Sequence, residues 1–420
     1  MEIREQVEQE AIEANRASAS LTDEAVAAAL EEAAALVRER SAAVLAANEA
    51  DCDAAAGRLD EGTLDRLRLG TARVETLAEQ VEAMAAIEPL EREIDAWTLA
   101  NGLEISERRI PIGTVGANFE ARPNVALDVG GQLLKSLNAA VLRTGGAALR
   151  TVTALVDEVL RPALERAGLP PGAVGLVRTP DHEGARALVS LPRRIPLVIL
   201  RGSGETTAAL ARLAAEHGVR ALAHAEGGGV LYVHESASRE RLLSIAEASL
   251  DRLGVCNRLN LALVDRRAPD GILAALLATF ERLGLDVYGT VRARNGTTLR
   301  PLETRLGHEW ANDPDRVAGV TVDVVDDLAE AVRLANEETS GLAASIVAED
   351  ESAAQSFFDG YRGTAAAWNA PTRFVDGFEL TGAPETGINV GREPGPRGPV
   401  TYRDLWLRQY RIVGDGTQRR

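Results

Sequence analysis

The chain is short of cysteine and of long apolar stretches, and each shortage excludes a class of protein. Its 420 residues include only two cysteines, Cys52 and Cys256. Two thiols so far apart cannot form a disulfide framework or a thiolate metal cluster. The apolar runs are far shorter than the ~18 residues that a membrane span needs, and the first ten residues lack the basic start and apolar stretch of a secretory signal. We therefore expect a soluble, cytoplasmic protein.

Positive charge and histidine are also scarce. The net charge is −17, from 46 Lys and Arg against 63 Asp and Glu, and such a field repels the phosphates of nucleic acids. The five histidines form no HExxH sequence and no pair four residues apart, so we expect no metal site. A Walker A loop and a GxSxG element are absent as well, so the sequence supports neither a P-loop enzyme nor a serine hydrolase.

The remaining pattern predicts an α/β fold. Up to about Pro89, Ala, Glu, Leu and Arg recur at helical spacing, and Thr22 is a candidate helix cap. Residues 103–115 predict a β-ribbon that leads into a buried strand. Short apolar runs then alternate with helical segments, which is typical of parallel sheets covered by helices. The predicted strands are 139–142, 175–177, 197–200 and 221–223 in a first lobe, and 230–233, 260–264, 320–325 and 343–348 in a second.

Two short turns have the composition of functional sites. Gly202-Ser203-Gly204 follows a predicted strand and opens a predicted helix, so its backbone N–H groups could bind an anion or a nicotinamide. A tight strand-to-helix turn explains the same residues, because the third glycine of a dinucleotide fingerprint is missing. Cys256 lies among small residues between a helix and a strand, where a thiol is approachable. A lone cysteine is otherwise more often a small buried apolar residue.

Five segments, one of which contains the cysteine turn, together indicate a protein family. They are 113–124 (GTVGANFEARPN), 134–143 (LKSLNAAVLR), 253–257 (LGVCN), 368–374 (WNAPTRF) and 397–399 (RGP). In this combination the chain resembles the gamma-glutamyl phosphate reductases of the aldehyde dehydrogenase superfamily, nearly end to end. The resemblance implies an aldehyde dehydrogenase-like α/β fold with two parallel-sheet lobes and a β oligomerisation flap.

The resemblance also implies a reaction. Enzymes of this family reduce L-glutamyl 5-phosphate with NADPH to glutamate 5-semialdehyde and phosphate, a step of proline biosynthesis, through a thioester on a cysteine. Cys256 matches that nucleophile, and no metal is required. Asn124 and the backbone N–H of Cys256 match the donors that stabilise the oxyanion, and Asn257 completes the catalytic set.

Binding residues follow from the same resemblance. Arg143 matches the place where the superfamily sets a basic residue against the cofactor ribose, and a guanidinium can pair with a 2′-phosphate. No acidic residue follows it in 144–148, which favours NADP over NAD. Gly202, Ser203, Gly204 and Glu309 are the other expected cofactor contacts. Glu120, Arg122, Asn369 and Arg373 are the expected substrate contacts.

Departures from the family pattern leave the reaction open. Residues 225–229 (AEGGG) and 340–345 (SGLAAS) replace a family cysteine and histidine and resemble general aldehyde dehydrogenases, whose Glu-x-Gly-Gly element supplies a base. If Glu226 reaches the thioester, water attacks it and the product is an acid. If Glu226 points away or is a solvated loop charge, the reductase reaction remains. Two further hypotheses are a paralogue that reduces a related acyl phosphate in specialised biosynthesis and a catalytically silent oligomeric or regulatory subunit.

The resemblance divides the chain into three parts. Residues 1–99 and 113–226 should bind the cofactor, residues 227–400 should carry the catalytic cysteine, and residues 100–112 with 401–413 should form the flap. Exposed edge strands such as 405–413 often pair with another subunit, so we expect a homodimer or homotetramer. An upstream glutamate kinase that hands over its unstable acyl phosphate is a candidate transient partner.

Overall fold

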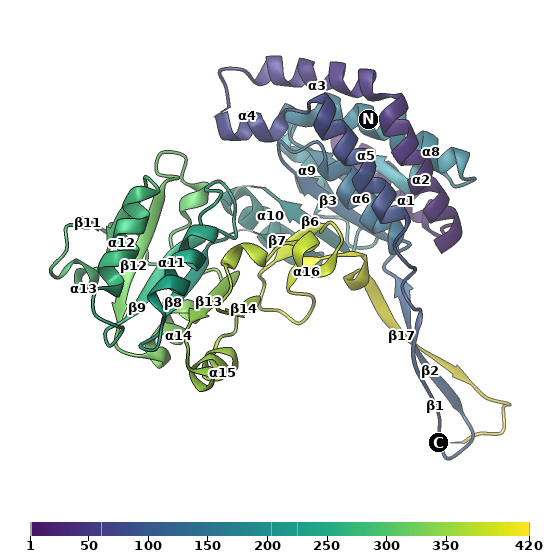
Figure 1. Ribbon diagram of the computed structural model, residues 1–420. Helices are drawn as coiled ribbons and strands as arrows, with labels where there is room; N and C mark the ends of the chain where they lie inside the picture. The colour runs from purple at the N-terminus through teal and green to yellow at the C-terminus, as the bar shows by residue number, and fades with distance from the viewer. Residues whose placement is uncertain (1, 60, 203, 225, 420) are drawn as a thin grey trace. The chain divides into compact units, whose positions relative to one another are not determined.

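The chain begins with helices that bury one apolar face each. They are α1 (Ile3–Ser18), α2 (Asp23–Glu39), α3 (Ser41–Ala55), α4 (Glu61–Leu67) and α5 (Thr71–Ala85) (Figure 1). The computed structural model describes residues 2–59, 61–202, 204–224 and 226–419. Thr22 caps α2 as predicted, because its hydroxyl accepts a hydrogen bond of 3.2 Å from the Ala25 N–H. The opening is therefore helical, as the composition predicts.

A sheet of the order β5-β4-β3-β6-β7 follows. Its strands are β3 (Thr114–Phe119), β4 (Ala139–Thr144), β5 (Val174–Leu176), β6 (Leu197–Arg201) and β7 (Arg220–His224), and the pairs β3–β4, β3–β6 and β4–β5 are parallel. The intervening helices are α6 (Val125–Lys135), α7 (Leu149–Ala154), a π-helical turn (Leu155–Leu160), α8 (Arg161–Arg166), α9 (His182–Leu188) and α10 (Gly204–Glu216). Continuous apolar strands between helices confirm the predicted α/β class.

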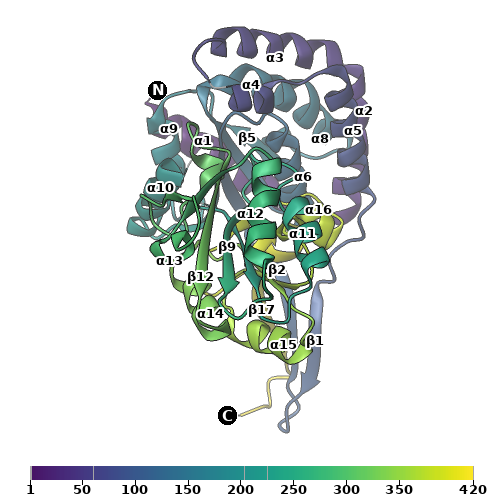
Figure 2. The ribbon, with the colours of Figure 1, turned by 60° about the vertical axis from the view of Figure 1, so that its left-hand side comes forward.

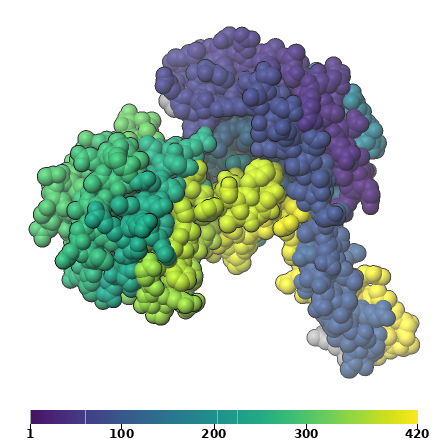
Figure 3. Space-filling model, viewed as in Figure 1, coloured from purple at the N-terminus to yellow at the C-terminus, as the bar shows by residue number. Residues whose placement is uncertain are grey.

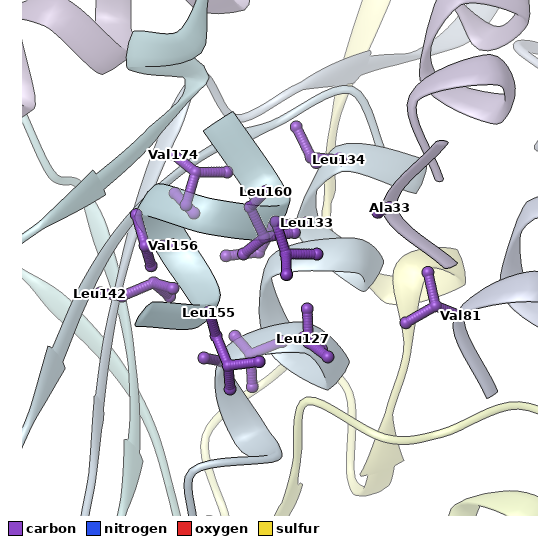
Figure 4. Close-up of a cluster of buried hydrophobic side chains, with 14 of the residues drawn as sticks. Ala33, Val81, Leu127, Leu133, Leu134, Leu142, Leu155, Val156, Leu160 and Val174 are labelled. Carbon is purple, nitrogen blue, oxygen red and sulfur yellow. The ribbon is translucent and has the colours of Figure 1, made fainter. Parts of the chain in front are cut away.

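Helix α6 lies at the centre of the core on one side of this sheet. Leu127 of α6 lies beside Leu155 of the π-helical turn, and Leu133 of α6 lies beside Leu160 (Figure 4). Leu142 of β4 and Val81 of α5 belong to the same buried cluster. Each buried leucine contributes about 1.5–3 kcal/mol relative to an exposed one. The packing fixes the start of α6, where several of the predicted site residues lie.

A three-stranded antiparallel ribbon projects from this part of the chain (Figures 1 and 2). It consists of β1 (Glu93–Thr98), β2 (Glu104–Pro111) and β17 (Trp406–Val413), in the order β1-β2-β17. In the space-filling view it forms a narrow arm of blue and yellow residues (Figure 3). The ribbon therefore begins at Glu93, and its expected start at residue 100 is wrong. All six side chains of β1 are exposed, so no apolar alternation marks that strand in the sequence.

A second parallel sheet has the order β11-β10-β12-β9-β8-β13-β14. Its strands are β8 (Gly229–Val233), β9 (Leu259–Asp265), β10 (Asp286–Gly289), β11 (Arg300–Pro301), β12 (Gly319–Val325), β13 (Ala343–Val347) and β14 (Ala365–Trp368). Its helices are α11 (Arg239–Ala248), α12 (Ile272–Arg282), α13 (Val291–Arg294), α14 (Leu328–Glu337), α15 (Glu351–Gly360) and α16 (Gly377–Thr381). The short strands β15 (Gly387–Asn389) and β16 (Gly398–Val400) pair with each other. The predicted second α/β lobe is thus present. The short strands β10, β11 and β14 of its sheet were not predicted, nor was the pair β15 and β16.

Contacts divide the chain into two compact units. The first comprises Met1–Ala223, Ala383–Gly387 and Val400–Arg420, and the second comprises His224–Gly382 and Ile388–Pro399. The cofactor and catalytic roles expected for the two lobes stay predictions. None of the described helices is long and apolar enough to cross a membrane, and no group of three or more His, Cys, Asp or Glu among the described residues could hold a metal ion.

Candidate active site

In the first unit, the turns that follow β3, β4 and β6 gather around Glu120. A Cβ placed on Gly202 would lie 3.1 Å from Cδ of Glu120, and one placed on Gly145 would lie 4.0 Å from its Cγ. The carboxyl ends of parallel strands are where α/β sheets bind ligands. Glu120, Gly202 and the start of α10 at Gly204 therefore share one edge, whereas Ser203 lies outside the described residues.

Arg143, at the end of β4, is only 3% exposed. Its Nη1 donates to Oδ1 of Asn118, and its Nη2 donates to the carbonyls of Pro180 and Asp181, all at 3.1 Å. Burial lowers its pKa, and the charges of Glu120 and Asp181 oppose that shift. Nη1 thus binds the neighbouring strand β3, and Nη2 binds the loop at residues 180–181. The position of Arg143 in the sequence does not reveal these contacts.

Two buried polar atoms at this strand end fit a polar ligand. Within the described residues, Nε of Arg143 and Oγ1 of Thr144 are buried without a hydrogen-bond partner. Orphaned polar groups are costly in a protein interior, so they call for a water, an ion or a ligand. A nicotinamide cofactor at the sheet edge has hydroxyl and phosphate oxygens that suit such atoms. Contact between Arg143 and a ribose or 2′-phosphate stays a prediction.

Asn124 lies at the end of the turn that follows β3. The turn contains Ala121 at φ +43°, in the left-handed region that non-glycine residues rarely adopt, and it leaves Arg122 exposed. Asn124 is the N-cap residue of α6, but its side chain makes no capping hydrogen bond. Instead its Nδ2 donates to Oδ2 of Asp128 at 2.9 Å, and burial raises the pKa of Asp128 to about 6.

In the second unit, Cys256 lies in the turn between α11 and β9, as the sequence predicts. The residue is partly buried and packs against an apolar cluster of Leu342, Ala343, Val375 and Ile388. Its backbone carbonyl accepts a hydrogen bond of 2.6 Å from the Gly228 N–H. The thiol is therefore held on a fixed turn beside an apolar wall, and neither Cys256 nor Cys52 forms a disulfide within the described chain.

Glu309 lies beside this cysteine. A Cβ placed on Gly227 would lie 2.6 Å from Oε1 of Glu309 and 2.7 Å from Cβ of Cys256. Glu309 is 7% exposed, and its Oε1 is buried without a hydrogen-bond partner among the described residues. Burial raises the pKa of Glu309, and the Gly227 N–H, the Asn312 side chain and the Arg305 charge oppose the shift. The resemblance assigns Glu309 to the cofactor ribose, and nothing in the local sequence reveals its proximity to Cys256.

Glu226 has a different environment. Its Oε2 forms an ion pair of 2.5 Å with Nη2 of Arg305, and both side chains are about half exposed. A surface carboxylate that is already paired with a guanidinium is directed toward that partner and not toward a substrate water. The geometry therefore favours a paired loop charge over a base directed at Cys256.

Three further predicted residues hold backbone segments in the second unit. Nδ2 of Asn257 donates to the carbonyls of Arg373 and Val375, both at 3.1 Å. Arg373 donates back to Oδ1 of Asn257, and its Nε donates to Asp251 at 2.6 Å. Asn369, at φ +54°, is bonded through its side chain to both backbone groups of Ala348. These contacts fix the cysteine turn and segment 368–375, and the predicted catalytic and substrate roles of these residues stay predictions.

Arg258, two positions after Cys256, was not identified from the sequence. It is fully buried, and its guanidinium donates to the backbone carbonyls of Leu259, Val317 and Gly319. Burial lowers its pKa to about 10. The signal in the sequence is an arginine directly before an apolar strand. A charged side chain buried at such a position needs hydrogen-bond partners inside the protein.

Comparisons with known proteins agree over most of the chain. Residues 3–294 and 320–403 match the aldehyde dehydrogenase family. A gamma-glutamyl phosphate reductase from Zymomonas mobilis is 33% identical over 375 residues, which cover 89% of this chain and 86% of that protein. One from Sphingopyxis alaskensis is 36% identical over 376 residues, which cover 87% and 84%. The crystal structure of gamma-glutamyl phosphate reductase from Thermotoga maritima has a TM-score of 0.91 at 26% identity, with 99% of this chain and 100% of that chain covered.

Proposed function

The chain belongs to the aldehyde dehydrogenase family, as its motifs predict, and from that premise we propose that it reduces L-glutamyl 5-phosphate to glutamate 5-semialdehyde and phosphate. The protein is an oxidoreductase that acts on an aldehyde. The substrate, the use of NADPH, the thioester and a place in proline biosynthesis are the proposal. The observation that carries it is Cys256, fixed on its turn against the apolar cluster and next to the buried Glu309.

The proposed chemistry uses the thiolate of Cys256. The thiolate attacks the carbonyl carbon of the acyl phosphate, the C–O bond to phosphate breaks, and a thioester forms. Bound NADPH would supply the hydride that reduces the thioester, after which the C–S bond breaks and the aldehyde leaves. Asn124 would donate a hydrogen bond to the carbonyl oxygen while that oxygen carries charge, an interaction whose loss typically costs ~10²–10³ in rate.

The cofactor would lie at the sheet edge that includes Arg143, Gly202 and Gly204. Arg143 and Thr144 offer the orphaned atoms described above. Residues 144–148 lack the acidic residue that commonly binds the ribose hydroxyls of NAD, which supports NADPH over NADH.

Reduction is favoured over hydrolysis by the pairing of Glu226 with Arg305. The sequences of segments 225–229 and 340–345 still differ from the family pattern, so a related amino-acid acyl phosphate is the second candidate substrate. The same core chemistry would serve either compound. The two are separated by comparing kcat/KM for glutamate 5-semialdehyde with that for shorter and longer semialdehydes.

The ribbon is the proposed contact between subunits. Exposed apolar side chains lie on β1, directly after it and on β17, namely Ile94, Trp97, Leu99, Leu407, Tyr410, Ile412 and Val413. Trp97 and Tyr410 pack edge to face at 6.2 Å and so tie β1 to β17 within one ribbon. A second copy of this chain would cover these side chains, giving a homodimer or homotetramer. Contact with a glutamate kinase and a cytoplasmic location stay predictions.

A single-turnover experiment tests the thioester. Glutamate 5-semialdehyde and NADP⁺ without phosphate should form one NADPH per subunit and leave the acyl group on Cys256, detectable by intact mass. Phosphate should then release it and restart turnover. Cys52→Ala should behave as the wild type and Cys256→Ala should show no burst. A burst that persists in Cys256→Ala would overturn the proposal.

A further inference from the structure

Asp128 is the hydrogen-bond partner of the Asn124 side chain. The distance from Nδ2 of Asn124 to Oδ2 of Asp128 is 2.9 Å. The two residues are four positions apart at the start of α6, so they lie on the same face of the helix. An asparagine amide nitrogen carries two hydrogens. Asp128 takes one of them, and the second can be donated to a ligand.

The charges around Asp128 do not provide a simple ion pair. Arg201, at the end of β6, faces it together with Glu385, and Nη2 of Arg201 lies 3.5 Å from Oε1 of Glu385. Nη1 of Arg201 donates to the carbonyl of Thr386 at 3.3 Å. The Arg201 guanidinium thus serves a second carboxylate and a carbonyl, whereas the Asp128 carboxylate accepts from the Asn124 amide. A partly buried carboxylate with such a partner suits an orienting role.

From this arrangement we infer that Asp128 is a positioning residue for Asn124. By accepting one amide hydrogen, Asp128 fixes the plane of the amide and aims the other hydrogen in one direction, toward the substrate carbonyl oxygen. Preorganised donors stabilise a developing oxyanion because they need no reorientation during the reaction. The inference rests on the proposed function, in which Asn124 is that donor.

The arrangement has a consequence at mildly acidic pH. Burial and the charge of Glu385 raise the pKa of Asp128, while Arg201 and the Asn124 amide oppose them, and the result is about 6. Below pH 6 the carboxyl gains a proton and can donate to the amide oxygen of Asn124 instead of accepting from its nitrogen. The amide would then be held with its oxygen toward Asp128, and its N–H groups would no longer be aimed as they are above pH 6. Activity should therefore fall as the pH decreases through 6 for a reason that involves neither the thiol nor the cofactor.

A double-mutant cycle tests this inference in the full-length enzyme. Asn124→Ala should lower kcat by ~10²–10³. Asp128→Asn keeps the size of the side chain but removes its charge, and it should lower kcat about tenfold with little change in KM, because the amide is misaimed rather than absent. In the Asn124→Ala background, Asp128→Asn should cause no further loss. The decrease in kcat near pH 6 should be present in the wild type and missing in Asp128→Asn, and thermal unfolding should show that each variant is folded.

The outcomes separate the two claims. If Asn124→Ala keeps full kcat, the oxyanion role of Asn124 in the proposed function is wrong, and the positioning role of Asp128 is wrong with it. Asn124→Ala could lower kcat as expected while Asp128→Asn lowers kcat about tenfold both in the wild type and in the Asn124→Ala variant. The proposed function then stands, and only the positioning role of Asp128 is overturned. If kcat of Asp128→Asn still decreases near pH 6 as it does in the wild type, the positioning role is also overturned.

Discussion

Glu226 and Arg305 form an ion pair, with 2.5 Å between Oε2 and Nη2. Glu226 is the residue on which the reductase and hydrolase interpretations of the sequence divide. Both partners are about half exposed, so the pair itself contributes little to stability, about 0–1 kcal/mol. Its importance lies in directing the Glu226 carboxylate toward the Arg305 guanidinium. A free carboxylate on the same loop would be a better base for water.

The first prediction concerns this pair. Glu226→Gln should leave the phosphate-dependent rate within about twofold, because a paired surface carboxylate contributes little to the chemical step. Arg305→Gln releases Glu226 and should increase the phosphate-independent formation of acid, which is measured as NADPH formation without phosphate. If Glu226→Gln abolishes turnover, Glu226 is not the bystander that its pairing indicates.

The second prediction concerns Glu309 and the thiol. When it is ionised, the Glu309 carboxylate next to Cys256 opposes a second negative charge on the thiol. Glu309→Gln removes that charge, and alkylation of Cys256 by iodoacetamide at pH 7 should become roughly 3- to 10-fold faster. The rates are measured in a Cys52→Ala background so that Cys256 alone reports. The matched control is Glu303→Gln, which alters an exposed glutamate and should change nothing. Slower alkylation in Glu309→Gln would refute the influence of Glu309 on the thiol.

The third prediction concerns Arg143. Its guanidinium pairs with Oδ1 of Asn118 and with two backbone carbonyls. Arg143→Met would leave these buried acceptors unpaired and should lower the free energy of unfolding by about 1–3 kcal/mol. Urea unfolding measures that loss. If Arg143 also contacts the cofactor, the dissociation constant for NADPH should rise more than that for NADH, and an equal change for both would contradict selectivity through this residue.

The fourth prediction concerns the ribbon. Ile412 is 63% exposed on β17, and a partner subunit would bury it. Ile412→Asp should shift the protein toward monomers in sedimentation velocity, since an unpaired charge in an apolar interface is costly. Leu283→Asp, at an exposed apolar position of the second unit, is the control and should keep the wild-type assembly state. A monomeric wild type would rule out the flap as an oligomer contact.

The elements that the sequence predicts well are those whose pattern is local. Val230 to Val233 is an uninterrupted apolar run, and it forms a fully buried central strand, β8, as such runs do in parallel sheets. By contrast, β1 was not predicted because its side chains face solvent on a ribbon and so carry no apolar alternation. Backbone pairing, which leaves no mark on side-chain polarity, creates that strand.

In the candidate site too, the features set by local sequence are predicted and those set by distant contacts are not. Cys256 lies on the turn that its small neighbours predict, because the turn is a local feature. The proximity of Glu309 to Cys256 depends on how Gly227 brings two distant loops together, and no local pattern encodes it. Asp128 was missed for a related reason. A carboxylate in the first turn of an amphipathic helix normally faces water and favours the helix dipole, and its partnership with Asn124 becomes visible only with side-chain geometry.

The phosphate dependence of the reverse reaction tests the proposed reductase activity most directly. Glutamate 5-semialdehyde and NADP⁺ are mixed with the enzyme, and NADPH absorbance is followed with and without inorganic phosphate. We predict sustained NADPH formation only when phosphate is present, and none in Cys256→Ala under either condition. Sustained turnover without phosphate would contradict the proposed activity, because water rather than phosphate would then be the acceptor of the acyl group.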